Sequence, residues 1–414
     1  MTGPEAARRL LASPVLRRLA TVWDGGQVFL TGGSLRDRLL GLPTHDLDLA
    51  VTGDPRAAAE AFAAHLGGRC FPLGRTPLVT WRVAGGRHHA DLWRIEHGVE
   101  HDILRRDFTV NALFWRLPRG PLLDLVGGLD DLAAGRVRVV REENLAADPL
   151  RVLRGVRLLA THPHLRLTAG TERQLGAAAP GLRSVARERV FDELRTLVSG
   201  RGVERALLVA ARIGVMENLL PAWRAYGHAR SVARLAAELR MLQRAGGAVV
   251  RGAQEVAVAV LAAPAAGFPS SWDVPAAEAA LAAVGFPPRA ASRAAAAAAT
   301  GERLLHVLGR NVTEEHSLAV EADAVLEPAT AWAVARSAMA GTDARAAGAA
   351  LLRWWRRFAA RPPLLAGDEI AELLALPADS TRGEATRALR LARARGEVRT
   401  REQARRFLRD LEFR

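Results

Sequence analysis

The chain has 414 residues, of which 49% are hydrophobic and 25% charged, and this balance is typical of a folded globular protein and excludes a disordered chain. A chain of this length is expected to form about two to four domains. Its formal net charge of +14 favours a polyanionic partner such as RNA or DNA. The chain contains no Lys, however, so a compositional bias toward Arg and Ala explains the charge equally well.

Cysteine content and apolar segments bear on where the protein works. Cys70 is the only cysteine, so the chain can form neither an internal disulfide nor a Cys-based zinc site, which fits a reducing cytoplasm. The charge-free segment 256–272 contains Pro264 and Pro269 and is a poor candidate for a membrane helix. With no export signal recognised, we expect a cytoplasmic protein that does not bind a membrane, and no protein partner is evident.

Strand signals are concentrated in the first 140 residues. Four apolar runs predict strands, at 28–30, 47–51, 78–83 and 137–140. The segment 55–66 has the spacing of a helix, and from Asp148 onward helical spacing replaces strand-like runs almost completely. We therefore predict an α+β protein with an N-terminal mixed α/β head, followed by an all-helical neck, body and tail.

A glycine turn follows the first predicted strand. Gly32 and Gly33 come directly after this strand and before a predicted helix. Glycines let the backbone approach a ligand closely, and the N–H groups at the start of a helix attract phosphate. The turn therefore predicts a binding site for a triphosphate.

Asp46 and Asp48 lie on the second predicted strand. Residues two apart on a strand project from the same face, so the two carboxylates point together and can share one divalent cation. Hard oxygen ligands of this kind suit Mg²⁺, which assists phosphoryl transfer. An Asp-x-Asp pair alone is a weak signal, but its combination with the glycine turn predicts this chemistry.

The segment GGSLRDRLLG at 32–41, followed by Asp46-Leu47-Asp48, resembles the signature of polymerase-β-like nucleotidyltransferases. It is most similar to that of the bacterial class II tRNA nucleotidyltransferase and poly(A) polymerase family. This resemblance implies that Asp46 and Asp48 are catalytic and hold Mg²⁺. It also implies that the nucleotide is bound by Gly32, Gly33, Ser34 and Arg36.

Two further motifs extend the resemblance. The segment 105–113, RRDFTVNAL, resembles the family's second motif, which implies that the sugar and phosphates are oriented by Arg106, Asp107 and Asn111. The segment 148–157, DPLRVLRGVR, resembles the family's base-reading motif. It implies that Asp148 and Arg151 select the base and that Arg154 and Arg157 hold the triphosphate.

The spacing of this base-reading motif supports its role. Residues three apart on a helix share a face, so Asp148 and the three arginines are expected to form one stripe. The family usually has an acidic residue just before this Asp, but Ala147 occupies that position here. The choice of base therefore stays open.

The resemblance implies a domain order and the partners. We expect a catalytic head at 1–140, a neck with the base-selecting helix at 141–202, a helical body at 203–350 and a tRNA-binding tail at 351–414. The tail resembles the family's C-terminal tRNA-binding segment. The implied partners are the tRNA acceptor arm with its 3′ end, and CTP, ATP or both.

A short segment bears on the product. Only residues 95–104 separate the segment 91–94, which resembles the family strand with a third acidic residue, from Arg105. Full CCA-adding relatives have a longer, flexible, basic loop here, and relatives that add only CC lack it. The resemblance thus favours CC addition. A CCA-adding enzyme with a shortened loop is an open alternative, poly(A) polymerase is a third, and a non-catalytic RNA-binding protein on this fold is a fourth.

Overall fold

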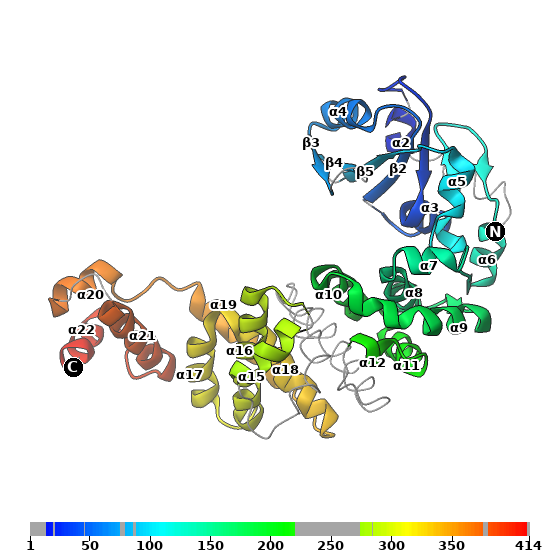
Figure 1. Cartoon of the computed structure of the whole chain (residues 1–414). Coiled ribbons are helices and arrows are strands. Elements are labelled where there is room, and N and C mark those ends of the chain that lie inside the picture. The colour runs from blue at the N-terminus through cyan, green and yellow to red at the C-terminus, as the bar shows by residue number, and fades with distance from the viewer. Residues whose placement is uncertain are drawn as a thin grey trace. The chain divides into compact units, whose positions relative to one another are not determined.

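A computed structural model describes residues 14–19, 21–44, 46–74, 79–85, 88–219, 274–283, 285–375 and 380–411. The chain divides into two compact units, Met1–Ser184 and Val185–Arg414 (Figure 1). The first contains a mixed sheet with helices and the second is helical, which confirms the predicted α+β class. Part of the predicted body, 220–273, lies outside the described residues.

The described strands of the first unit form a seven-stranded sheet in the order β3-β4-β5-β2-β1-β6-β7. The strands are β1 (Val28–Thr31), β2 (Asp46–Val51), β3 (Arg69–Leu73), β4 (Thr80–Gly85), β5 (His88–Arg94), β6 (Phe114–Arg116) and β7 (Leu122–Leu123). All neighbours are antiparallel except β2 and β5, which are parallel. A parallel pair needs a crossover connection, and here α4 (Pro55–Leu66), β3 and β4 provide it.

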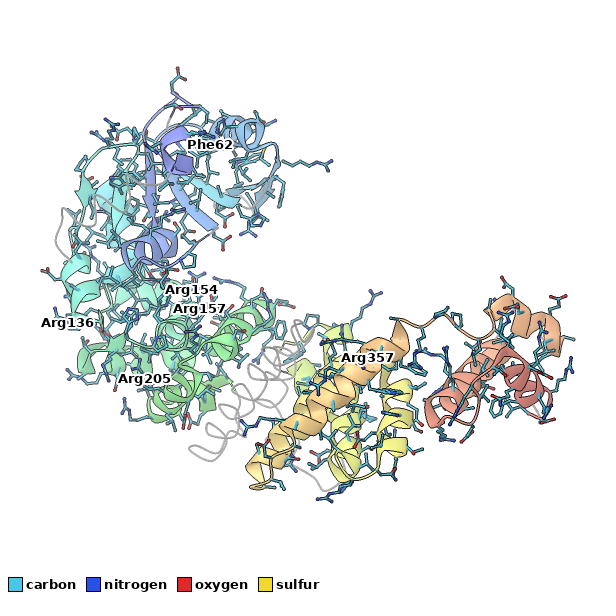
Figure 2. The ribbon with its side chains drawn as sticks, turned by 180° about the vertical axis from the view of Figure 1, so that it is seen from behind. Phe62, Arg136, Arg154, Arg157, Arg205 and Arg357 are labelled. Atoms are coloured by element: carbon cyan, nitrogen blue, oxygen red, sulfur yellow. The ribbon has the colours of Figure 1, made fainter. Side chains whose placement is uncertain are left out.

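Helix α4 has the bounds that the sequence predicts. It begins at Pro55, whose missing N–H is no loss in a first turn, and the Asp54 side chain accepts from Arg56 N at 2.9 Å. It ends at Leu66 and is capped by Gly67, whose φ of 62° is left-handed. Its buried face includes Phe62, which is fully buried and packs α4 against the sheet (Figure 2).

The other described helices of the first unit connect and flank the sheet. They are α2 (Pro14–Leu19), α3 (Gly32–Leu39), α5 (Val99–Leu104), α6 (Gly128–Ala134), α7 (Glu143–Ala147), α8 (Leu150–Thr161) and α9 (Ala169–Ala178), with 3-10 turns at Thr109–Asn111 and Ala179–Ser184. Two short strands, β8 (Arg136–Val137) and β9 (Arg166–Leu167), pair in parallel. The predicted strand at 137–140 is therefore too long: only Val137 belongs to β8, and Val139 forms an isolated bridge with Phe108.

Every described element of the second unit is helical. The helices are α10 (Arg187–Ser199), α11 (Val203–Arg212), α12 (Val215–Leu219), α15 (Val274–Ala283), α16 (Pro288–Val307), α17 (Val312–Ala322), α18 (Leu326–Met339), α19 (Arg345–Ala359), α20 (Gly367–Leu374), α21 (Ser380–Arg395) and α22 (Arg401–Arg409), with a 3-10 turn at Asp323–Val325. Helices α16 and α18 approach closely at Gly301, where a Cβ would lie 2.7 Å from Trp332. Among the described helices, none combines the length and apolar character needed to cross a membrane.

Candidate active site

The β1–α3 turn closes over the second carboxylate of the Asp pair. Gly32 has a φ of 64°, and a Cβ there would lie 2.8 Å from Asp48 Oδ2, so both the backbone conformation and the space require glycine. Ser34 N donates to Asp48 Oδ2 at 3.1 Å, and Asp48 N donates to Ser34 Oγ at 2.9 Å. The structure therefore joins the predicted phosphate turn to the predicted metal-binding strand.

Asp46 and Asp48 lie on one face of β2, because Leu47 and Leu49 between and after them are buried on the other. Asp46 is exposed, whereas Asp48 is partly buried. Burial raises the pKa of Asp48, and the Ser34 N–H and the charge of Arg106 offset only part of this rise.

The parallel pairing of β2 and β5 brings a third carboxylate to this face. Asp91 is the register partner of Asp48, so the two side chains project from the same side of the sheet. The Asp91 carboxylate accepts from Arg82 Nε at 2.7 Å and Arg82 Nη2 at 2.6 Å. The resemblance of segment 91–94 to the family strand with a third acidic residue points to Asp91, but only the strand register shows that it lies beside Asp48.

The carboxylates have the donor chemistry of a divalent cation site. Within the described residues, no group of three or more His, Cys, Asp and Glu side chains is arranged to hold a metal by itself. Asp46 and Asp48 supply hard oxygen ligands. Burial makes the negative charge of Asp48 unfavourable, and a bound cation would offset this cost. The pair therefore fits a cation whose remaining ligands come from a nucleotide.

Arg36 lies in a buried network that links three segments. Arg36 is 7% exposed. Its guanidinium donates to Asp37 Oδ1 at 2.8 Å and to Asn111 Oδ1 at 2.6 Å. Asn111 Nδ2 in turn donates to Asp107 Oδ1 at 3.0 Å, and His162 Nε2 lies 2.9 Å from Asp37 Oδ1. Three of the predicted nucleotide-binding residues are thus in one network. Whether Arg36 also reaches a phosphate stays a prediction.

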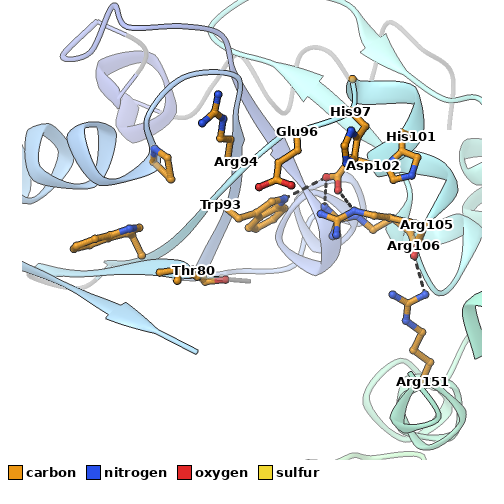
Figure 3. Close-up of a pocket in the computed structure, with 14 residues that line it drawn as sticks. Thr80, Trp93, Arg94, Glu96, His97, His101, Asp102, Arg105, Arg106 and Arg151 are labelled. Carbon is orange, nitrogen blue, oxygen red and sulfur yellow. Dashed lines mark hydrogen bonds and ion pairs between the residues drawn. The ribbon is translucent and has the colours of Figure 1, made fainter. Parts of the chain in front are cut away.

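Arg106 and Arg151 line a cavity of about 500 Å³ (Figure 3). Trp81 and Trp93 also line it, whereas the glycine turn and the Asp pair are not part of its wall. The Arg106 guanidinium lies 4.9 Å from the ring centre of Trp93. Burial lowers the pKa of Arg151, and the charges of nearby carboxylates oppose this change.

The base-reading motif differs from the prediction at its first residue. Helix α8 begins at Leu150, and Asp148 precedes it in an extended conformation, with φ −141° and ψ 90°. Pro149 explains this, because a residue before proline is disfavoured in the helical conformation. Arg151, Arg154 and Arg157 are all half-buried and share one face of α8, on which Figure 2 labels Arg154 and Arg157. The stripe therefore holds for the arginines, and Asp148 precedes the helix.

Solved structures with the same fold span nearly the whole chain. The *Bacillus stearothermophilus* CCA-adding enzyme in complex with CTP superposes with a TM-score of 0.67 at 23% identity, covering 99% of this chain and 98% of that one. The *Thermotoga maritima* CCA-adding enzyme complexed with tRNA gives 0.65 at 20% identity, covering 97% of both chains.

Sequence relatives identify the family. A poly A polymerase head domain model matches residues 28–138, and a model described as the probable RNA and SrmB-binding site of polymerase A matches 164–226. The A-adding tRNA nucleotidyltransferase of *Deinococcus radiodurans* is 39% identical over 46% of this chain, which spans only 44% of that relative's length. The CC-adding tRNA nucleotidyltransferase of *Geobacter sulfurreducens* is 31% identical over 93% of this chain and 92% of its own. The chain therefore belongs to the family of tRNA nucleotidyltransferases and poly(A) polymerases.

Proposed function

We propose that this protein is a template-independent tRNA nucleotidyltransferase, which transfers nucleotides from CTP, ATP or both to the 3′ end of tRNA and releases pyrophosphate. The observation that carries the proposal is the contact of Asp48 with the Gly32–Ser34 turn, because it sets a carboxylate at the place where a triphosphate fits. The tRNA substrate is supported by the *Geobacter* relative, which aligns over nearly the whole chain.

In this mechanism the terminal 3′-hydroxyl of the RNA attacks the α-phosphate, and pyrophosphate leaves. The backbone N–H of Gly33 would hold a phosphate at the start of α3, and Ser34, whose N–H donates to Asp48, would hold the turn against the carboxylate. Asp46 and Asp48 would hold Mg²⁺, which when bound neutralises charge on the phosphates and on the leaving group. Asp91, adjacent to Asp48 across the strands, would add to the negative charge of this face.

The remaining predicted residues would orient the nucleotide. Arg106, Asp107 and Asn111 would contact its sugar and phosphates, and Arg36 would fix the Asn111 side chain through their 2.6 Å hydrogen bond. Asp148 and Arg151 would select the base, since a carboxylate accepts from an exocyclic amine and a guanidinium donates to ring acceptors. Arg154 and Arg157 would hold the triphosphate.

We propose CC as the product. The segment 95–104 consists of a short connection after β5 and the helix α5, which leaves no room for a long loop between Arg94 and Arg105. Relatives named as A-adding, CC-adding and CCA-adding enzymes all match, so their names do not distinguish the products.

The test is to incubate the protein with tRNA lacking its CCA end and with CTP, ATP or both, and then to sequence the 3′ termini. Products that end in CC with both nucleotides present support the proposal. Termini ending in CCA would overturn the restriction to CC and keep the enzyme class, poly(A) tails would indicate the polymerase alternative, and unextended tRNA would contradict the function itself.

Asp48→Asn is expected to slow nucleotide incorporation by about a thousandfold, because loss of a metal ligand removes about 4 kcal/mol of transition-state stabilisation. Binding of tRNA should be unchanged, because the expected tRNA-binding tail, 351–414, does not include this residue. Asp24→Asn, which removes an exposed carboxylate of the same unit, is the matched control. Single-turnover rates and gel-shift affinities measure both effects, and a wild-type rate in Asp48→Asn would rule out the metal assignment.

A further inference from the structure

A buried carboxylate outside the Asp pair organises one wall of the cavity. Asp102 lies on α5 and is 2% exposed. Its Oδ2 accepts from Trp93 Nε1 at 3.2 Å and from Arg106 Nη2 at 3.1 Å, and its Oδ1 accepts from Arg105 Nε (Figure 3). Burying a carboxylate costs little free energy only when hydrogen-bond donors surround it, and here three side chains donate to Asp102.

Asp102 fixes the turn that follows α5. Its bonds to Arg105 and Arg106 anchor the side chains of two consecutive residues of this turn. The Arg106 guanidinium is further enclosed by the rings of Trp93 and Phe114, whose centres lie 4.9 and 5.1 Å away. The turn is therefore held from the head side by one buried acidic group.

The backbone of the same turn is bound from the other side by α7 and α8. Arg151 Nη1 donates to the carbonyl oxygen of Arg105 at 2.7 Å. Asn144 Nδ2 donates to the carbonyl oxygens of Leu104 and Arg106 at 2.9 and 2.7 Å. Of these three consecutive carbonyls, the middle one connects the turn to α8, which carries the proposed base-selecting arginine, and the outer two connect it to α7.

The bond from Arg151 to Arg105 sets the direction of a planar group. A guanidinium presents its donors in a rigid fork, so a bond at Nη1 restricts the directions in which the other N–H groups can point. An arginine that reads a base depends on this direction, because its donors must meet acceptors on the base edge.

We infer that Asp102 is a positioning residue for base selection: it holds the 104–106 turn, and the Arg105 carbonyl in that turn orients Arg151 toward the base of the incoming nucleotide. The inference rests on the proposed function and deepens it. Asp102 does not contact the nucleotide; it acts through Arg105 and Arg151.

The test compares Asp102→Asn with wild type for incorporation of CTP and UTP onto tRNA lacking its CCA end. The preference for CTP over UTP, as a ratio of kcat/KM values, is expected to fall about tenfold, because a charge-assisted bond that fixes the turn is lost. Glu100→Gln, an exposed change on the same helix, should leave the ratio unchanged. An unchanged ratio in Asp102→Asn, with both rates reduced equally, would show that Asp102 is only structural and would overturn the inference.

Two further variants guard against a folding defect in Asp102→Asn. Arg105→Gln removes a half-exposed partner of the same carboxylate, and Asn144→Ala releases the turn from the α7 side; both should lower the ratio in the same direction. Equilibrium dialysis of CTP and UTP provides a readout independent of turnover, and equal retention of the CTP preference in all three variants refutes the inference. A wild-type protein that incorporates no nucleotide would instead refute the proposed function.

Discussion

Arg36 and Asp37 are adjacent on α3, but their partners belong to different segments. Arg36 donates to Asn111 in the second motif, whereas Asp37 is bonded to His162 at the end of α8. The motifs predict which residues gather near the nucleotide. They do not reveal His162, because no local pattern connects a residue 125 positions along the chain to Asp37.

The Asp37 contacts predict a pH dependence of stability. Burial alone would raise the pKa of Asp37, but the hydrogen bond to His162 and the charge of Arg36 outweigh it and hold the pKa below 3.8. A lowered pKa stabilises the fold above the unfolded value near 3.8, and this contribution is lost as pH falls through the lower folded value.

Asp37→Asn should therefore lose stability at pH 6 and show a weaker further loss on acidification than wild type. Urea unfolding at several pH values between about 6 and 3 measures this difference. Asp24→Asn, in which the carboxylate is exposed, is the control and should follow wild type. Parallel stability curves for Asp37→Asn and wild type would contradict the assignment.

At the scale of elements, the sequence is informative where apolar periodicity is regular and the ends are marked. Strands β1 and β2 and helix α4 are predicted closely for this reason. Strand β3 is missed because it is an edge strand that contains Pro72 and has no buried face. The place of Asp91 beside Asp48 needs the strand register, which the sequence does not state.

The β1–α3 turn predicts a difference between two glycines. Gly32→Ala combines a left-handed φ with a contact of 2.8 Å to Asp48, whereas Gly67→Ala has a similar φ of 62° and no atom within 4 Å. Both should cost about 1 kcal/mol of stability from backbone strain. Only Gly32→Ala should also reduce kcat/KM, by about a hundredfold, because the displaced carboxylate no longer meets the turn.

Thermal unfolding and nucleotide incorporation, measured on both variants, separate strain from displacement. Equal activities per folded molecule in the two variants would show that the close approach of Gly32 to Asp48 is unimportant.

At the scale of the molecule, part of the net charge of +14 comes from a cluster of arginines in the second unit. Arg353 and Arg357 are exposed on α19, and Arg361 is exposed just after its end. Together with Trp354 and Phe358 they line a pocket of about 260 Å³. Arginines beside aromatic rings suit the phosphates and bases of RNA. The net charge alone left a polyanionic partner and a compositional bias equally open, whereas the resemblance placed these residues in the expected tRNA-binding tail, 351–414. That the arginines gather beside aromatic rings follows only from the packing of α19.

Arg357→Gln should weaken tRNA binding and make it less dependent on salt. Each phosphate contact contributes a slope of about −0.9 to log K against log salt for duplex nucleic acid, so the slope should become shallower by about one. Filter binding over a series of salt concentrations measures it. Arg17→Gln, an exposed change of equal charge in the first unit, is the control. Identical slopes for the two variants would mean that α19 has no specific contact with RNA.

The parallel pairing of β2 and β5 has a consequence for how the site comes into being. Asp48 and Asp91 lie 43 positions apart in sequence and become neighbours only when β2 and β5 pair. Such a non-local pairing forms slowly, because the entropy of closing the intervening chain must be overcome first. A half-folded chain therefore lacks the proposed catalytic face, and the activity of a preparation measures the fraction of molecules whose sheet is complete.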